Sequence, residues 1–299
     1  MIREAEQYLE MRRKLGYALT VQGRQLLGFA RHVDKIGHEG PLTAEIALMW
    51  AQATSASSMH RARRLDVVRQ FAHYMKLSVP ETEIPQEGIL GPSCRRMAPR
   101  IYSEQEIQAL IAACRRLTPG IRPHTYATLF GLLACTGMRI SEALHLCVDD
   151  VDVERGVITI IEGKFHKSRL LPLHPSCTEA LAAYRELREK RRPATRTFFV
   201  THYGTSLKCL KARMTFRGIA GRLGWGRDAR IHCLRHTFAV KRLLQWHRDG
   251  EDVDRHIGQL STYLGHCTVQ DTYWYLSAIP ELMGIAAERF ECYAEVRHG

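Results

Sequence analysis

The chain has 299 residues, which is long for one simple domain and enough for two domains that each bury a core. It is 45% hydrophobic and 25% charged, as folded proteins usually are, and no apolar run approaches the roughly 20 residues that span a bilayer, so no membrane partner is expected. Lys and Arg number 43 against 31 Asp and Glu, a net charge of +12 that favours a polyanionic partner.

Four helices are predicted in residues 1–78, which would form the first domain. Helical periodicity or a capping residue marks each helix. The four segments are residues 1–15, residues 20–36, a helix opened by Pro41-Leu42-Thr43, and a helix capped by Ser57 or Ser58 that runs to about Met75.

The fourth of these helices has a basic side. Its apolar residues recur at helical spacing from Leu65 to Met75 and predict a face that is buried in a core. Four arginines lie largely off that face, where they could be solvated or could contact the phosphates of a nucleic acid. They are Arg61, Arg63, Arg64 and Arg69.

Residues 79–101 differ in composition from the segments on either side. They contain four prolines and two glycines, and their apolar residues follow no sustained period. We interpret this segment as a linker between two domains. An extended chain gains about 3.3 Å per residue, so the linker is long enough to reach around a duplex.

Residues 102–299 are predicted to form a second domain that is mixed but mostly helical. Ser103 and Glu106 make a capping box that opens its first helix. A β-branched run at residues 157–161, a turn at residues 162–167 and a returning run at residues 168–174 predict a hairpin. The fold class is therefore mainly α with a small antiparallel sheet. The strands are residues 157–161 and 168–174, and the further helices are residues 125–135, 177–190, 209–223, 236–246 and 253–264, with a last one entered through Pro280.

The cysteines and the N-terminus indicate a cytoplasmic protein. The nine cysteines are odd in number and form no Cys-x-x-Cys pair, so neither a disulfide framework nor a zinc ribbon is expected. The first residues are charged and lack the apolar core of a signal peptide.

Arginines and histidines stand in short motifs of the second domain. Arg139 follows a glycine at a predicted helix start, where its guanidinium could hold two phosphate oxygens and Glu142 could orient it. His232 and Arg235 are three residues apart and would point to the same side of a helix. His266 follows a glycine that ends the preceding helix. Each of these residues alone could equally be structural.

Tyrosines and lysines near these motifs supply further candidates. Tyr275 lies nine residues after His266, and Tyr273 and Tyr263 are its competitors. Lys164 lies in the predicted hairpin turn, and Lys167 is its rival.

Together these residue types match what phosphodiester transfer to a tyrosine requires. The nonbridging oxygens gain charge in the transition state and must be met by fixed donors. The phenol, with a pKa of about 10, needs help to lose its proton, and the leaving 5′ oxygen needs an acid. Two arginines, two histidines, a lysine and a tyrosine can fill these roles, so no metal or other cofactor is expected.

The motifs resemble, in order and type, those of the tyrosine recombinases or phage-type integrases. Three boxes carry the resemblance: Thr136 to Leu144, His232 to Ala239, and Leu264-Gly265-His266 with Tyr275 nine residues on. The likeness covers the chain from about Tyr102 to its end. The helical first domain resembles the core-binding, SAM-like domain of that family.

The resemblance implies roles for the residues that contact the phosphate. Arg139 and Arg235 would clamp it. His232 would accept or donate a proton there, and His266 would hydrogen-bond to it.

The resemblance also implies a nucleophile and an acid. Tyr275 would form a 3′-phosphotyrosyl bond, since the offset of Tyr273 does not match the family. Lys164 would protonate the 5′ oxygen. Phe165 stands where the family often has a glycine, so Lys167 remains open as the acid.

Function and partners follow from the same resemblance. It implies a site-specific recombinase, encoded by a mobile element, that acts on double-stranded DNA in the bacterial nucleoid. Members of the family act as tetramers on two DNA sites, so a homotetramer is expected. The last helix, from Leu282 to Phe290, could dock on a neighbouring subunit or cover its own domain.

Three alternatives remain beside this reading. A type IB topoisomerase would use the same chemistry to relax DNA, and a non-catalytic integrase homologue would only bind it. A metal-dependent nuclease would need carboxylates to hold its metal, and the chain has a cluster of acidic residues that could supply them. We interpret this acidic cluster instead as the turn before a strand. These residues are Asp149, Asp150, Asp152 and Glu154.

Overall fold

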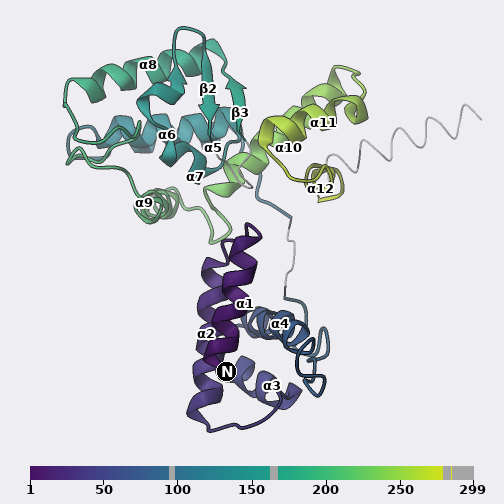
Figure 1. Ribbon diagram of the computed structural model, residues 1–299. Helices are drawn as coiled ribbons and strands as arrows, with labels where there is room; N and C mark the ends of the chain where they lie inside the picture. The colour runs from purple at the N-terminus through teal and green to yellow at the C-terminus, as the bar shows by residue number, and fades with distance from the viewer. Residues whose placement is uncertain (94–97, 162–167, 279–283, 285–299) are drawn as a thin grey trace, which may run out of the picture. The chain divides into compact units, whose positions relative to one another are not determined.

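The computed structural model describes residues 1–93, 98–161, 168–278 and 284, and the chain divides into two compact units, Met1–Arg96 and Met97–Gly299 (Figure 1). Helices dominate both units, and the described part of the second unit contains a small antiparallel sheet, which confirms the predicted fold class. Among the described residues, no helix is both long and apolar enough to span a membrane. The helix predicted to begin at Pro280 lies outside the described residues.

The described residues of the first unit form four helices, of which the third and fourth begin where the capping residues predict. Thr43 Oγ1 accepts the backbone N–H of Ile46 at 3.3 Å, and Ser57 Oγ accepts that of His60 at 3.4 Å. The inward faces of the helices share a core that includes the fully buried ring of Phe29. The helices are α1 (Ile2–Lys14), α2 (Thr20–Lys35), α3 (Ala44–Gln52) and α4 (Ser58–Met75).

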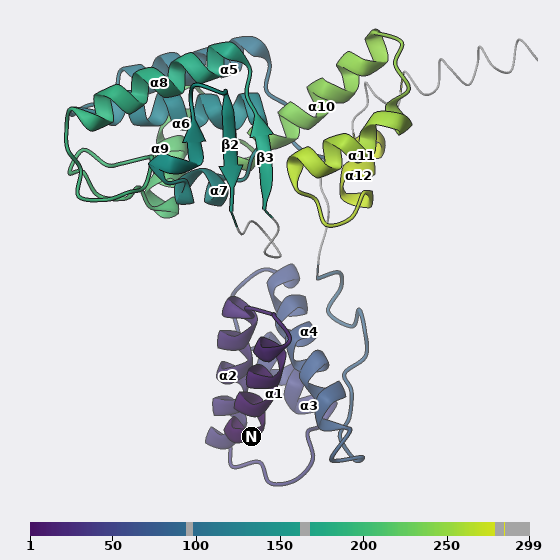
Figure 2. The same cartoon turned by 45° about the horizontal axis from the view of Figure 1, so that its top comes forward.

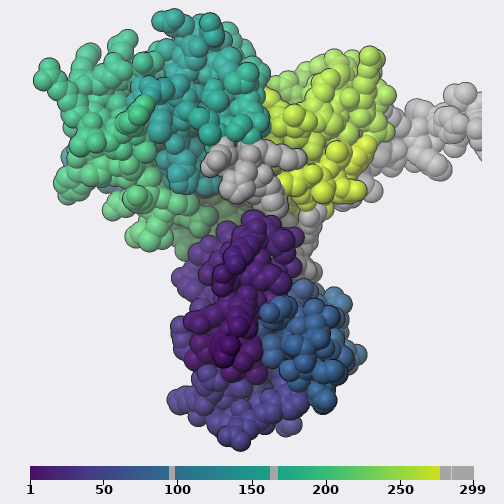
Figure 3. Space-filling view, viewed as in Figure 1, coloured from purple at the N-terminus to yellow at the C-terminus, as the bar shows by residue number. Residues whose placement is uncertain are grey.

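The chain after α4 packs on the first unit. Val79, Ile84 and Leu90 contact the core of the four helices. The carboxylate of Glu83 accepts the backbone N–H of Ala44 at 2.8 Å, at the start of α3. Figure 3 shows the blue residues around and after α4 closely packed beside the purple α1. The segment predicted as a linker is thus partly built into the first unit, because its apolar side chains complete the core.

The second unit packs helices around a three-stranded antiparallel sheet in the order β1-β2-β3 (Figure 2). Ile158 lies opposite both Val151 and Leu171. Ile158 and Leu171 are buried in a core that also takes side chains from α5, α6, α8 and α9. The elements are α5 (Glu104–Arg115), α6 (Arg122–Thr136), α7 (Ile140–His145), η1 (Val148–Asp150), β1 (Val151–Asp152), β2 (Val157–Ile160), β3 (Arg169–Pro172), α8 (Pro175–Glu189), α9 (Cys209–Arg222), α10 (His232–Arg248), α11 (Val253–Leu264) and α12 (Gln270–Ala278).

The capping box at the start of the second unit is confirmed. Ser103 Oγ accepts the backbone N–H of Glu106 at 3.1 Å, and the Glu106 carboxylate accepts the backbone N–H of Ser103 at 2.9 Å. The predicted hairpin is also present, because β2 and β3 pair antiparallel.

Helices α10, α11 and α12 gather at one end of the second unit (Figures 1 and 2). They share a small core that includes Val240, Leu243, Leu260 and Tyr275. The sequence did not predict α12, since its apolar residues follow no clear helical period. This short helix carries Tyr275 back against α10.

Candidate active site

A tight turn at the end of α6 places the first arginine. Gly137 ends the helix with a φ of +63°, and a Cβ on this residue would lie 2.6 Å from Cδ1 of Phe238. Both the backbone conformation and the close approach therefore require glycine. Arg139 follows at once as the residue that precedes α7.

A buried carboxylate holds Arg139 in place. Arg139 Nη1 donates to Glu142 Oε1 at 2.8 Å, and its Nη2 donates to the carbonyl of Gly265 at 2.7 Å. Arg169 of β3 donates to both oxygens of Glu142, at 3.1 and 2.9 Å. Burial raises the pKa of the Glu142 carboxyl, but Arg169 and Arg139 outweigh burial and hold this pKa below its usual range. Glu142 thus stays charged and links two guanidiniums.

Arg235 ties together the ends of two helices. Its side chain is buried, and it donates from Nη1 to the carbonyl of Gly137 and from Nη2 to that of Leu264, both at 2.9 Å. Burial, followed by the charge of Arg139, lowers its pKa to about 10. Arg235 therefore remains charged at neutral pH, beside Arg139, and the two guanidiniums make a fixed positive centre.

Three histidines surround this positive centre. His232 is exposed, yet the protein atoms around it and then the charges of Arg235 and Arg139 lower its pKa to about 4. Burial and then Arg235 lower the pKa of His266 to about 4, and its Nδ1 lies 2.6 Å from Thr272 Oγ1. The third is His236, whose ring centroid lies 4.7 Å from that of His232. All three rings are neutral at neutral pH.

Tyr275 lies among these groups. Only 2% of it is exposed, and its Oη lies 2.8 Å from Nδ1 of His236. Burial raises the pKa of Tyr275 to about 12, while the neighbouring Arg235 opposes that effect. In the free chain the phenol is protonated and held next to a guanidinium and an imidazole.

The two competing tyrosines point elsewhere. Tyr273 is 41% exposed, and its hydroxyl donates to Asp254 Oδ1 of α11 at 3.2 Å. Tyr263 stacks on Phe238, and its hydroxyl donates to the carbonyl of Pro172 at 3.4 Å. Of the three tyrosines, the structure brings Tyr275 to the arginines.

Sequence reasoning missed two residues of this cluster. The signal for His236 was available, because it lies one helical turn after His232 and therefore on the same face of α10. Arg169 carried no such signal, since β3 meets α7 only through the tertiary fold. Lys164 and Lys167, the two candidates for the general acid, lie outside the described residues.

The four arginines of α4 have different surroundings in the first unit. The guanidinium of Arg64 lies 3.9 Å over the ring of Trp50 and donates to its carbonyl at 2.7 Å. Arg69 forms ion pairs with Asp66 and Glu87, at 2.9 and 3.0 Å. Arg64 and Arg69 therefore stabilise their own unit. Of the other two, Arg63 is exposed and its Nε donates to the carbonyl of Ser93 at 2.7 Å, and Arg61 is half-buried.

The acidic residues before β2 support turns. Asp150 accepts the backbone N–H of Cys147 at 2.7 Å, and Asp152 accepts those of Glu154 and Arg155 at 3.1 and 2.9 Å. These contacts agree with the interpretation of the acids as the turn before a strand.

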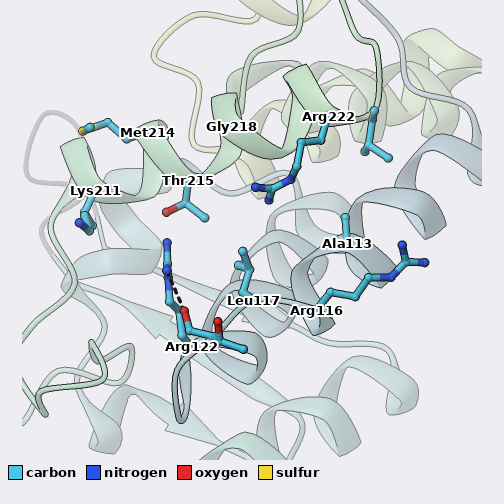
Figure 4. A pocket seen from close by; sticks show the side chains of 11 residues that line it. Ala113, Arg116, Leu117, Arg122, Lys211, Met214, Thr215, Gly218 and Arg222 are labelled. Atoms are coloured by element: carbon cyan, nitrogen blue, oxygen red, sulfur yellow. Dashed lines mark hydrogen bonds between the residues drawn. The ribbon is translucent and has the colours of Figure 1, made fainter.

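Two basic hollows flank α9. One, of about 440 Å³, lies beside the cluster of arginines and histidines and is lined by Arg213, Arg217, Arg230 and His232. The other, of about 640 Å³, lies between α5, α6 and the opposite side of α9, where Figure 4 shows the basic side chains around it. Of the predicted catalytic residues that the structure describes, none lines this second hollow. Its basic residues are Arg116, Arg122, Lys211 and Arg222.

Comparison with known sequences points to one family. Residues 100–280 match the model of the phage integrase family. The integrase/recombinase y4rB of Sinorhizobium fredii is 38% identical over 96% of this chain and 95% of its own length. The tyrosine recombinase XerD of Listeria innocua is 30% identical over 76% of this chain and 74% of its own length.

Solved structures share the fold at low sequence identity. The XerH site-specific recombinase bound to palindromic difH substrate has a TM-score of 0.68 and 19% identity, over 89% of this chain and 78% of that one. The Tn1549 transposon integrase in complex with transposon right end DNA has a TM-score of 0.74 and 13% identity, over 98% of this chain and 99% of that one.

Proposed function

The chain belongs to the phage integrase family and is a tyrosine recombinase, and we propose that Tyr275 is the nucleophile with which it cleaves DNA at a specific site. The observation that supports this most strongly is the convergence of separate segments. Arg139 bonds to Gly265, and Arg235 bonds to Gly137 and Leu264, so the ends of α6 and α11 meet beside the phenol.

The two arginines act on the scissile phosphate. Arg139 and Arg235 bind its nonbridging oxygens and stabilise the charge that these oxygens gain as the phosphorus becomes pentavalent. His232 and His266 hydrogen-bond to the same group. Because backbone carbonyls and Glu142 already hold both guanidiniums, little reorganisation is needed when DNA binds.

The reaction conserves the energy of the broken bond. Tyr275 attacks the phosphorus, the bond to the 5′ oxygen breaks, and the DNA stays attached through a 3′-phosphotyrosyl bond. A 5′ hydroxyl of a partner strand reverses the step and joins the new strands. Lys164 or Lys167 protonates the leaving 5′ oxygen.

The partner is double-stranded DNA. The hollow lined by Arg213, Arg217 and Arg230 adjoins His232. It offers positive charge to the DNA backbone on one side of the scissile phosphate. In the first unit, Arg61 is the strongest candidate for a DNA contact, because Arg63, Arg64 and Arg69 each bond to groups of their own unit. We expect a homotetramer on two DNA sites in the bacterial nucleoid.

Trapping on a nicked suicide duplex tests the assignment. The recombination site is first mapped by recovering the DNA that the wild-type protein holds after denaturation. On that site, wild type and Tyr273→Phe should form an SDS-resistant adduct, and Tyr275→Phe should form none. An adduct that persists in Tyr275→Phe and is lost in Tyr273→Phe would sink the assignment of the nucleophile.

A further inference from the structure

Tyr275 makes one contact that none of the roles proposed for the arginines, His232 and His266 requires. Nδ1 of His236 lies 2.8 Å from Tyr275 Oη, and the two ring centroids are 5.5 Å apart. His236 is in the first turns of α10, and Tyr275 is in α12, so this hydrogen bond joins two helices at the reacting atom.

The other histidines of the site are engaged differently. Nδ1 of His266 bonds to Thr272 Oγ1 at 2.6 Å, and its ring centroid lies 6.4 Å from that of Tyr275. The rings of His232 and His236 form a T-shaped pair with an interplanar angle of 87°. Nδ1 of His236 is paired with Tyr275 Oη, and the Arg235 guanidinium also hydrogen-bonds to this phenol.

We propose that His236 is a catalytic residue of DNA cleavage, which orients Tyr275 through Nδ1 and accepts the phenol proton as Oη attacks the phosphate. The proposal rests on Tyr275 being the nucleophile. As the bond between Oη and phosphorus forms, the proton moves from Oη to Nδ1, and the bond from phosphorus to the 5′ oxygen breaks. The 5′ oxygen takes its proton from a separate acid, and ligation runs the same transfers backwards.

The charge around His236 suits this role. Burial, then His232, Arg235 and His266, lower its pKa to about 3, so the imidazole is neutral in the free chain and has a lone pair available. Tyr275 faces it from α12, His232 and Arg235 from α10, and His266 from the loop after α11. The scissile phosphate brings negative charge beside these groups and raises the affinity of the imidazole for a proton.

The test separates the nucleophile from the leaving group. Single-turnover cleavage is measured on the mapped suicide duplex and on the same duplex with sulfur in place of the bridging 5′ oxygen, which leaves without an acid. His236→Ala should cleave about 10²–10⁴-fold more slowly than wild type on both duplexes. The acid variants Lys164→Ala or Lys167→Ala should recover on the sulfur duplex.

Two further variants keep the test decisive. His236→Asn retains a polar atom near the position of Nδ1 but cannot take the proton. Its cleavage rate should therefore lie between those of wild type and His236→Ala. Cleavage by this variant should also lose the pH dependence that titration of the His236 imidazole gives the wild type. His124→Ala changes an exposed histidine of α6 and should cleave like wild type. Binding of the duplex should stay within about twofold for all variants that fold, as checked by circular dichroism.

Distinct outcomes overturn the proposal and the proposed function. If wild type forms an adduct and both His236 variants cleave within about threefold of it, His236 has no catalytic role. Recovery of His236→Ala on the sulfur duplex would place it at the leaving group instead. If wild type forms no adduct on any recovered DNA, the proposed nucleophile itself fails.

Discussion

Glu142 shows how much of the site depends on a single side chain. Its carboxylate is 5% exposed and bonds to both Arg139, which directly precedes α7, and Arg169 of β3. Charges that leave water need partners with good geometry, and removal of one partner leaves the others buried and unpaired. The proposed phosphate clamp therefore depends on a residue that does not itself contact DNA in the proposed reaction.

Glu142→Gln should lower both stability and activity. The variant keeps the shape of the side chain but removes the charge between two guanidiniums, so we expect a loss of about 3 kcal/mol in the free energy of unfolding. Glu189→Gln is the control, because Glu189 pairs with Arg185 at the surface, where loss of a partner costs less than about 1 kcal/mol. Urea unfolding measures both, and equal losses would contradict the role given to Glu142.

The neutral histidines make stability depend on pH. His236 and His266 have a pKa of about 3 and about 4 in the folded chain, below the value of about 6.5 for an unfolded histidine. Between these values the unfolded chain binds more protons, so stability is fully present above pH 6.5 and falls with acidification by about 1.4 kcal/mol per pH unit for each histidine.

His236→Gln should reduce the change in the free energy of unfolding with pH by the contribution of one histidine, about 1.4 kcal/mol per pH unit. Urea unfolding at a series of pH values from neutral to about 5 measures it. The matched variant His124→Gln should keep the wild-type slope. A His236→Gln slope equal to that of wild type would show that His236 is not held neutral in the folded chain.

At the scale of elements, local signals in the sequence predicted most of the helices and their starts. Thr43, Ser57 and Ser103 each bond to a backbone N–H within three residues, so the sequence alone contains the whole interaction. The hairpin was also predictable from local signals, because its two strands, β2 and β3, follow one another in the chain. The offset from His266 singled out the tyrosine that the fold brings to Arg235.

The features that the sequence could not predict depend on contacts between residues that are far apart along the chain. Arg169 reaches Glu142 across 27 positions, and His236 reaches Tyr275 across 39. Helix α12 has no clear apolar period of its own and forms against α10 and α11. Likewise, the proline-rich segment after α4 looked like a linker because nothing local shows that Val79 and Ile84 fit the core of the first unit.

Gly137→Ala tests the turn that joins α6 to the site. An alanine there must adopt a φ of +63° and meet Phe238 at 2.6 Å, so we expect at least about 1–2 kcal/mol of destabilisation and a loss of adduct formation, because Arg139 and the carbonyl that Arg235 binds both shift. Gly221→Ala in α9 is the control: its Cβ meets no atom within 4 Å, and alanine favours a helix. Equal stability of the two variants would contradict this account of the turn.

At the scale of the whole molecule, the net charge of +12 predicts how binding depends on salt. Each phosphate that a Lys or Arg neutralises releases counterions, so affinity for a duplex should fall steeply as salt rises. With about 6–10 phosphate contacts, the loss between about 50 mM and about 200 mM salt is about 10³–10⁵-fold. Fluorescence anisotropy with a labelled duplex measures it, and an affinity that is insensitive to salt would contradict a backbone-dominated interface.

The covalent bond itself is the most direct test of the central claim. The adduct formed on a suicide duplex is digested with nuclease and protease, and the peptides that carry a residual nucleotide are sequenced by mass spectrometry. Our account predicts a nucleotide attached through its 3′ phosphate to Tyr275. Attachment to Tyr273 or Tyr263, or through a 5′ phosphate, would contradict it.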